Sequence, residues 1–257
     1  MSATVPGYVL LPGWSMEAAS LTPLAQDLDA SAQILDLPGQ GGRRDETMPD
    51  SLADLAQVLE RNLRDGMVLI GWSLGALAAL AIAARGRVRP AALVLVTPTP
   101  RFLADVGWEH GVDPVLLERY AHSAQRDAEA LRDEFTSLLL LGDARRSATL
   151  RRLRALRRGV AAPAAATLVA GLGILRRADL RAACATIATP ALVVAGGADH
   201  VTPPGAARWL AAALPDATLV ELGSAGHALP MSHVPELTAA VAGFVGHRAL
   251  DARMTDA

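Results

Sequence analysis

The chain has 257 residues, of which 51% are hydrophobic, and this is enough for one large core or for a core with an inserted subdomain. Its formal net charge of −2 argues against a protein that binds nucleic acid over its whole surface. Cys184 is the single cysteine, and the first twelve residues lack the basic run and apolar core of a secretion signal, so we expect a cytoplasmic protein without disulfides.

Short apolar runs that end at Gly, Pro or Asp predict six strands along the chain. Helical patterns lie between several of them, and the first clear one begins at Ser51, where a capping box precedes leucines at helical spacing. Apolar strands that alternate with helices are typical of a parallel sheet covered on both faces. The expected strands are Tyr8–Leu11, Gln33–Leu35, Met67–Ile70, Ala92–Val96, Ala191–Ala195 and Thr218–Leu222.

The alternation stops in the middle of the chain. Residues 102–179 are expected to be helical throughout, because leucines recur there at intervals of three and four. We therefore expect an α/β core made of residues 1–100 and 180–257. Residues 101–179 are expected to form a helical lid over the strand ends.

A serine follows the third expected strand, in the sequence Gly71-Trp72-Ser73-Leu74-Gly75. A strand, a sharp turn and a helix with Ser at the tip of the turn form the arrangement that exposes a nucleophilic hydroxyl. Glycines fit on both sides because the turn leaves no room for side chains. The alternative is a glycine-rich turn with a buried serine.

An activated serine needs a base and an acid that orients it. Asp199 and His227 each follow a later strand, so Ser73, Asp199 and His227 are expected at the same edge of the sheet, in the chain order of α/β-hydrolases. His200 and His233 are rivals for the base. Neither a metal-binding histidine pattern nor a phosphate-binding glycine loop is found, so we expect no cofactor.

The oxyanion of an ester transition state needs two backbone N–H donors. Leu74 directly follows the serine and is the first candidate. Trp14, in the loop after the first strand, is the second. The alternative for Trp14 is a side chain that lines the pocket.

Five segments carry a family resemblance, namely Gly13-Trp14, Asp36 to Gly39, Gly71 to Gly75, Gly171 to Leu175 with Asp179 to Arg181, and Gly226 to Ala228 with Ser232-His233. With them the chain resembles the α/β-hydrolase superfamily and, more narrowly, the pimeloyl-acyl-carrier-protein methyl ester esterases of biotin synthesis. The resemblance implies a Ser73, Asp199 and His227 triad, oxyanion donors at Trp14 and Leu74, and an acyl channel lined by Phe135 to Leu139. Pro12 stands where the family usually has His, and the usual first hairpin is reduced, which leaves about six strands.

Residues 143–158 hold seven arginines and one acid, a local net charge of +6. An acidic acyl carrier protein would be attracted to such a face beside the active site. The candidate docking residues are Arg145, Arg146, Arg151, Arg154 and Arg158. A solvated helix face is the equal alternative, and nucleic acid is disfavoured because no aromatic residues lie among these arginines.

We therefore expect a monomeric serine esterase that hydrolyses the methyl ester of a pimeloyl chain carried on acyl carrier protein, with no membrane or nucleic-acid partner. Three alternatives remain open at this point. They are a broad carboxylesterase for small free esters, a lyase of menaquinone synthesis or cofactor-free perhydrolase with the same triad, and a non-catalytic binding protein on the same scaffold.

Overall fold

A computed structural model describes residues 7–255 of the chain, with side chains as far as residue 248. Within this part, six strands form one sheet in the order β2-β1-β3-β4-β5-β6, and every neighbouring pair is parallel. The sheet and its strand number agree with the expected fold. The strands are β1 (Tyr8–Leu11), β2 (Gln33–Ile34), β3 (Val68–Trp72), β4 (Ala92–Val96), β5 (Ala191–Gly196) and β6 (Ala217–Leu222).

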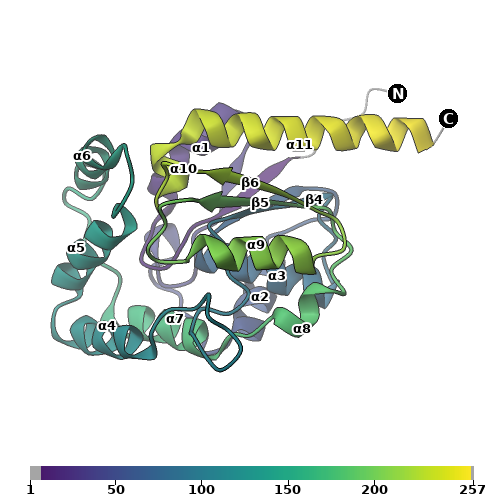
Figure 1. Ribbon diagram of the computed structural model, residues 1–257. Helices are drawn as coiled ribbons and strands as arrows, with labels where there is room; N and C mark the ends of the chain where they lie inside the picture. Colours follow the sequence, from purple (N-terminus) through teal and green to yellow (C-terminus); the bar gives the residue numbers. More distant parts are fainter. Residues whose placement is uncertain (1–6, 256–257) are drawn as a thin grey trace.

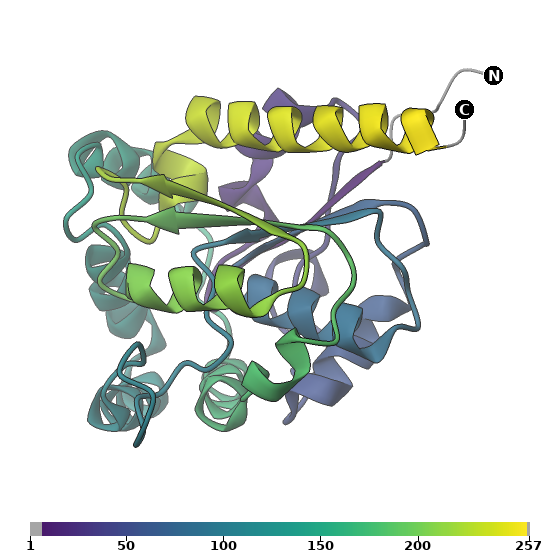
Figure 2. The same cartoon turned by 45° about the vertical axis from the view of Figure 1, so that its right-hand side comes forward.

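Helices cover both faces of the sheet, as its apolar strands require. The helices α1 (Thr22–Leu28), α10 (Leu229–Ser232) and α11 (Val234–Thr255) lie on one face (Figures 1 and 2). On the other face lie α2 (Leu52–Glu60), α3 (Leu74–Arg85), α8 (Arg181–Cys184) and α9 (Pro204–Ala213). Two short 3-10 turns, Ala18–Ser20 and Gly41–Arg43, complete the loops after β1 and β2.

The local signals of the sequence explain where these elements begin and end. All of β3, β4 and β5 is buried, which is why they consist of uninterrupted apolar residues. The expected cap of α2 forms, since the Ser51 hydroxyl accepts a hydrogen bond from Asp54 N at 3.1 Å. At the end of α3, Gly86 adopts a left-handed conformation with φ 64° that favours glycine.

Four helices form a separate group beyond the carboxyl ends of the strands (Figure 1). We call residues 101–179 the α4–α7 segment; it contains α4 (Pro114–Arg126), α5 (Ala128–Leu139), α6 (Arg146–Leu156) and α7 (Ala165–Arg177). Its two ends meet, because Arg101 and Asp179 form a backbone bridge and an ion pair of 2.8 Å. The expectation of helix throughout residues 102–179 is wrong for residues 102–112, which form isolated bridges and turns, and for residues 157–164 between α6 and α7.

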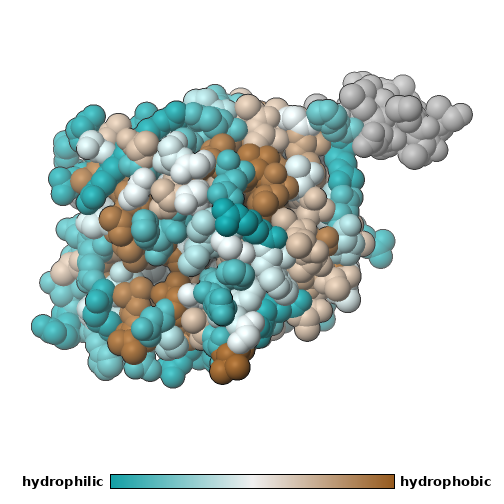
Figure 3. Space-filling model, viewed as in Figure 1, coloured by the Kyte–Doolittle hydropathy of each residue, from teal (hydrophilic) through white to brown (hydrophobic). Residues whose placement is uncertain are grey.

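Over the described part of the chain, no helix is long and apolar enough to cross a bilayer. On the side of the α4–α7 segment, apolar residues come to the surface around a hollow, with hydrophilic residues along the outer edge (Figure 3). Large apolar side chains of this segment are therefore exposed, among them Val115, Leu141 and Leu156.

Candidate active site

Ser73 occupies the turn between β3 and α3 in a strained backbone conformation, with φ 56° and ψ −116°. The two glycines allow this turn. A Cβ at Gly71 would lie 2.3 Å from the carbonyl oxygen of Gly75, and a Cβ at Gly75 would lie 2.3 Å from that of Leu11. The turn is fixed to the neighbouring strand because Ser73 N donates to the Val96 carbonyl at 3.1 Å.

Asp199 and His227 form a buried pair at the same edge of the sheet. Asp199 follows β5 and His227 follows β6, and the distance from His227 Nδ1 to Asp199 Oδ2 is 2.7 Å. The imidazole is completely buried and the carboxyl group nearly so. Because a carboxylate only accepts, Nδ1 donates the proton in this contact, and Nε2 is the nitrogen that can serve as acceptor in the matching tautomer.

The carboxylate of Asp199 is held in place by its own loop. Its Oδ1 accepts hydrogen bonds from Val201 N at 2.7 Å and Thr202 N at 2.9 Å. The Thr202 hydroxyl lies 2.9 Å from Asp199 Oδ2, 3.0 Å from the Thr97 carbonyl and 3.2 Å from His227 Nδ1. Sequence reasoning missed Thr202; the one available signal was its place three residues after Asp199, where short polar loops commonly bond back to the acid.

The second ring nitrogen of His227 has no hydrogen-bond partner among the described residues, Ser73 included. The backbone of His227 is fixed from the other side, because Trp72 Nε1 donates to its carbonyl at 2.9 Å. Bonds between a base and its nucleophile are commonly long before substrate binds. A buried acceptor at Nε2 and a strained serine at the same sheet edge can together move a proton from an attacking hydroxyl.

The two rival histidines have other surroundings. His200 is exposed. His233 is buried, and its ring nitrogens contact the hydroxyl groups of Ser232 at 2.8 Å and Ser224 at 3.4 Å. Burial lowers the pKa of His233, which opposes a proton-accepting role near neutral pH.

An apolar cavity of about 20 Å³ lies over Ser73. Trp14 and Phe135 both line it and meet edge to face, with ring centroids 4.8 Å apart. Of the expected channel residues, Phe135 and Leu138 line the cavity, whereas Leu139 is buried and its carbonyl accepts a hydrogen bond from Ala228 N. The other lining residues are Phe102, Val112, Leu116, Leu117, Tyr120, Leu172, Leu175 and Val201.

One expected oxyanion donor directly follows Ser73, and the other belongs to the loop after β1. Leu74 is the first residue of α3, where a backbone N–H has no acceptor within the helix. The loop after β1 packs on the serine, since a Cβ at Gly13 would lie 3.2 Å from Ser73 Cβ. The Trp14 indole donates to the Leu168 carbonyl at 3.0 Å, so this loop is also attached to α7.

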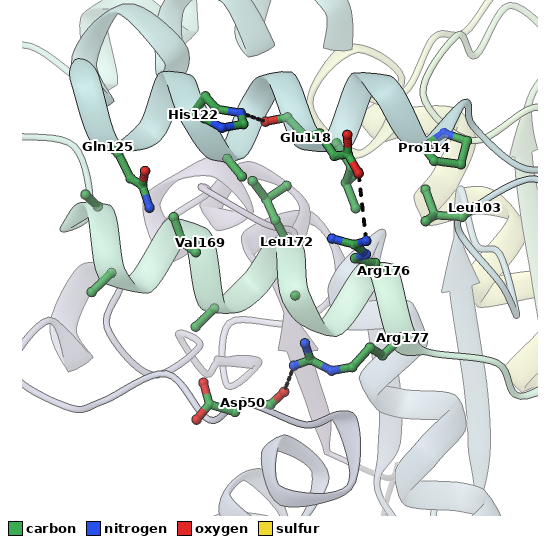
Figure 4. Close-up of a pocket in the computed structure, with 16 residues that line it drawn as sticks. Asp50, Leu103, Pro114, Glu118, His122, Gln125, Val169, Leu172, Arg176 and Arg177 are labelled. Carbon is green, nitrogen blue, oxygen red and sulfur yellow. Dashed lines mark hydrogen bonds and ion pairs between the residues drawn. The ribbon is translucent and has the colours of Figure 1, made fainter.

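A groove of about 850 Å³ runs along α4 and α7, which lie side by side (Figure 4). Leu117 and Leu172 line both this groove and the cavity over Ser73, so the two spaces adjoin. Charged residues bridge its rim. Arg176 pairs with Glu118 at 3.8 Å, and Arg177 donates to the Asp50 carbonyl. The groove is larger than the cavity, but the nucleophile lies in the cavity.

The arginines expected to dock a partner lie on and beside α6. Arg146, Arg151, Arg154 and Arg158 are exposed. Arg145 forms an ion pair with Glu236 and donates to the Ser232 carbonyl at 2.9 Å. Glu236 therefore already neutralises the charge of Arg145, whereas docking of an acidic partner requires an arginine whose charge is not neutralised within the chain.

The described residues contain no group of three or more His, Cys, Asp and Glu that could hold a metal ion.

Residues 8–241 match the family described as "Alpha/beta hydrolase family". The chain is 35% identical over 243 residues to a pimeloyl-acyl-carrier-protein methyl ester esterase of Xanthomonas campestris pv. campestris (strain B100), covering 93% of this chain and 95% of the relative. It is also 35% identical over 234 residues to an esterase of the same name from Nitrosomonas europaea, covering 90% and 92% of the two chains.

A solved hydrolase from Oleispira antarctica has the same fold. Its TM-score is 0.81 at 18% sequence identity, and the match covers 95% of this chain and 92% of that one. The structural match therefore covers both the core and the helical segment, and a sequence identity this low shows a shared fold only. From the family match and its extent, the chain belongs to the alpha/beta hydrolase family.

Proposed function

We propose that this chain is a serine carboxylesterase that hydrolyses the methyl ester of a pimeloyl group carried on acyl carrier protein, in biotin synthesis. The observation that carries the chemistry is the Asp199–His227 contact of 2.7 Å with a buried, unpartnered Nε2. The relatives that match nine tenths of the chain support the substrate. The single cysteine is consistent with a cytoplasmic enzyme.

In this mechanism the Ser73 hydroxyl attacks the ester carbonyl while His227 Nε2 takes its proton. The backbone N–H groups of Trp14 and Leu74 donate to the oxyanion. His227 then protonates the departing methanol and leaves an acyl-enzyme. Water, deprotonated by the same nitrogen, releases the free carboxylate and restores Ser73, and Asp199 stays ionised throughout.

We infer that the α4–α7 segment acts as a lid. A cavity of about 20 Å³ has room for one water molecule, and not for an acyl chain. We therefore infer that side chains or helices around this cavity move before an ester reaches Ser73, and Leu117 and Leu172 stand between the cavity and the larger groove. Phe135 and Leu138 would then form part of the acyl channel, because they already line the closed cavity.

We further propose that the exposed arginines of α6 receive the acidic carrier protein. They belong to a stretch with a net charge of +6 in a chain whose net charge is −2. Attraction between opposite charges speeds the encounter of two proteins, and added salt screens this attraction. Arg145 is the weakest of the five candidates because Glu236 already neutralises it.

The decisive measurement compares a carrier-bound pimeloyl methyl ester with a short nitrophenyl ester, each at low and high salt. A preference for the carrier-bound ester that falls with salt supports the proposal. Equal or better turnover of the small ester, insensitive to salt, refutes the proposal that the substrate is bound to a carrier protein and favours a broad esterase. Other products would indicate the lyase or perhydrolase alternatives.

Two sets of variants separate docking from chemistry. Replacing Arg151, Arg154 and Arg158 by Gln should lower kcat/KM for the carrier-bound ester alone. The matched control replaces Arg61, Arg64 and Arg87, which are equally exposed and follow α2 and α3 at the opposite edge of the sheet.

Changing Ser73 to Ala should abolish turnover and labelling by a fluorophosphonate while the protein stays folded. Full activity in this variant would overturn the serine mechanism. Failure of the probe to label the wild-type protein would instead favour a non-catalytic binding protein.

A further inference from the structure

The connection between α5 and α6 runs directly against the loop that carries His227. We call residues 139–145 the return turn. Two of its hydrogen bonds reach the residues on either side of His227. Gly226 N donates to Asp143 Oδ2 at 2.9 Å, and Ala228 N donates to the Leu139 carbonyl at 3.1 Å.

The return turn also touches the loop that carries the acid. Ala144 N donates to the Ser224 carbonyl at 3.0 Å, which adds a third bond to the histidine loop. Gly142 has φ 79°, and a Cβ there would lie 2.8 Å from the carbonyl oxygen of Ala198, the residue before Asp199. The return turn therefore lies in contact with both loops that hold the Asp–His pair.

Within the return turn, the side chain that bonds to the histidine loop is the buried carboxylate of Asp143. Its Oδ2 accepts from the Ser232 hydroxyl at 2.6 Å as well as from Gly226, and its Oδ1 accepts from Arg145 N at 2.7 Å. His233 Nδ1 is 3.8 Å away. A buried carboxylate with this many donors is fixed in direction as well as in place.

The packing leaves the histidine loop little freedom while these contacts hold. A Cβ at Gly226 would lie 3.2 Å from Asp143 Cβ and 3.2 Å from the Leu141 carbonyl oxygen. Without the carboxylate, the buried N–H of Gly226 would lack its acceptor, and a buried donor without a partner is costly. The loop would then shift toward another acceptor and carry His227 with it.

We propose that Asp143 is a positioning residue for His227. Through Gly226 it holds the histidine loop, and because Asp143 belongs to the α4–α7 segment, the base is correctly placed when that segment is docked on the core. The inference rests on the proposed function, in which His227 is the general base. It assigns Asp143 no contact with the substrate.

The test compares Asp143→Ala and Asp143→Asn with the wild-type protein on a short nitrophenyl ester, which needs no carrier protein. A shift of about 1 Å in a catalytic group costs up to roughly 100-fold in rate, so we expect kcat to fall about 10- to 100-fold in Asp143→Ala. KM should stay within about 2-fold, because binding of the ester is not touched. Asp143→Asn keeps one carbonyl oxygen and should lose less.

Asp127→Ala is the matched control. Asp127 lies in the same segment and accepts a hydrogen bond from Ala130 N at 3.0 Å, but it caps α5 and is exposed. It should leave kcat unchanged. Amide hydrogen exchange over residues 224–228 is the second readout, and it should speed up in Asp143→Ala and not in the control.

Wild-type kcat in a folded Asp143→Ala protein overturns the inference, and so does a fall in kcat without faster exchange in residues 224–228. If the Ala variant does not fold, Asp143→Leu, which fills similar space without an acceptor, decides by the same two criteria. Absence of esterase activity and probe labelling in the wild-type protein would defeat the proposed function instead. The exchange measurement would still show whether Asp143 holds the loop.

Discussion

A single methyl group added at Gly171 should disturb both the stability of the protein and its catalytic rate. Gly171 lies in α7, and a Cβ there would be 2.6 Å from Trp14 Cδ1 and 3.0 Å from Trp14 Nε1. Real Cβ atoms do not come that close, so the indole must move. The indole bond to the Leu168 carbonyl would be lost, and the loop beside Ser73 would lose its attachment to α7.

The expected magnitude follows from three effects. Overpacking a tight site costs roughly 1–3 kcal/mol. The lost indole hydrogen bond adds about 0.5–1.5 kcal/mol. Replacing a helical glycine by alanine stabilises the folded protein by about 1 kcal/mol, because alanine has the higher helix propensity. The net loss in the free energy of unfolding is therefore about 2 kcal/mol, or a fall in Tm of roughly 4–8 °C for a chain of this size.

Gly173→Ala is the matched control in the same helix. Its Cβ would meet only the flexible end of Arg177, at 3.2 Å, so the gain in helix propensity should dominate. We expect its Tm to stay level or rise by about 1–4 °C, with kcat unchanged.

The assay for both glycine variants is a thermal melt together with kcat on a short nitrophenyl ester. Because Trp14 carries a proposed oxyanion donor, kcat of Gly171→Ala should fall by about 10-fold or more, approaching the roughly 100-fold effect of losing such a donor. Equal melting points in the two variants, or a normal kcat in Gly171→Ala, would refute this reasoning.

Two further changes test the cavity and the buried histidine. Leu172→Ala should join the cavity over Ser73 to the groove along α4 and α7. It should raise kcat/KM for a dodecanoate ester relative to a butyrate ester, and it should lower the free energy of unfolding by about 2–5 kcal/mol. An unchanged ratio would contradict it. Burial lowers the pKa of His233, so below about pH 6.5 the unfolded chain takes up a proton that the folded chain resists, and stability falls as pH falls. His233→Gln should therefore show a smaller drop in Tm between about pH 7 and pH 5 than the wild-type protein, and an equal drop would count against this role.

The parts that local sequence predicted well are those that a few neighbouring residues determine. The central strands β3, β4 and β5 are buried on both faces, so their apolar runs stand out, and the expected boundaries of these strands lie within one or two residues of the observed ones. The turn at Ser73 was readable because Gly71 and Gly75 are required by contacts within the turn and with the adjoining strand. Asp199 and His227 followed from their places after β5 and β6, since parallel strands end at one edge.

The parts that were missed depend on contacts between distant segments. Thr202 touches Asp199 and His227 through a loop conformation that no short pattern predicts. Asp143 was noted only as the lone acid in a basic stretch, although its partner Gly226 lies 83 residues away. Residues 101–112 have no helix because their bonds go to one another and to Asp179. In each of these cases, tertiary contacts decided what the local signal left open.

The same helical segment that lines the cavity also contacts the loops on both sides of the proposed catalytic site. On one side, α7 fixes the loop after β1 through the indole of Trp14 and the space left by Gly171. On the other side, the return turn fixes the loop of His227 through Asp143. In the proposed mechanism, an ester enters when these helices move apart, and the oxyanion donor and the base take their places when the helices close again around the bound acyl chain. On this proposal, opening for substrate and assembly of the reactive groups are alternating states of one element, which keeps the activated serine away from water until an ester has bound.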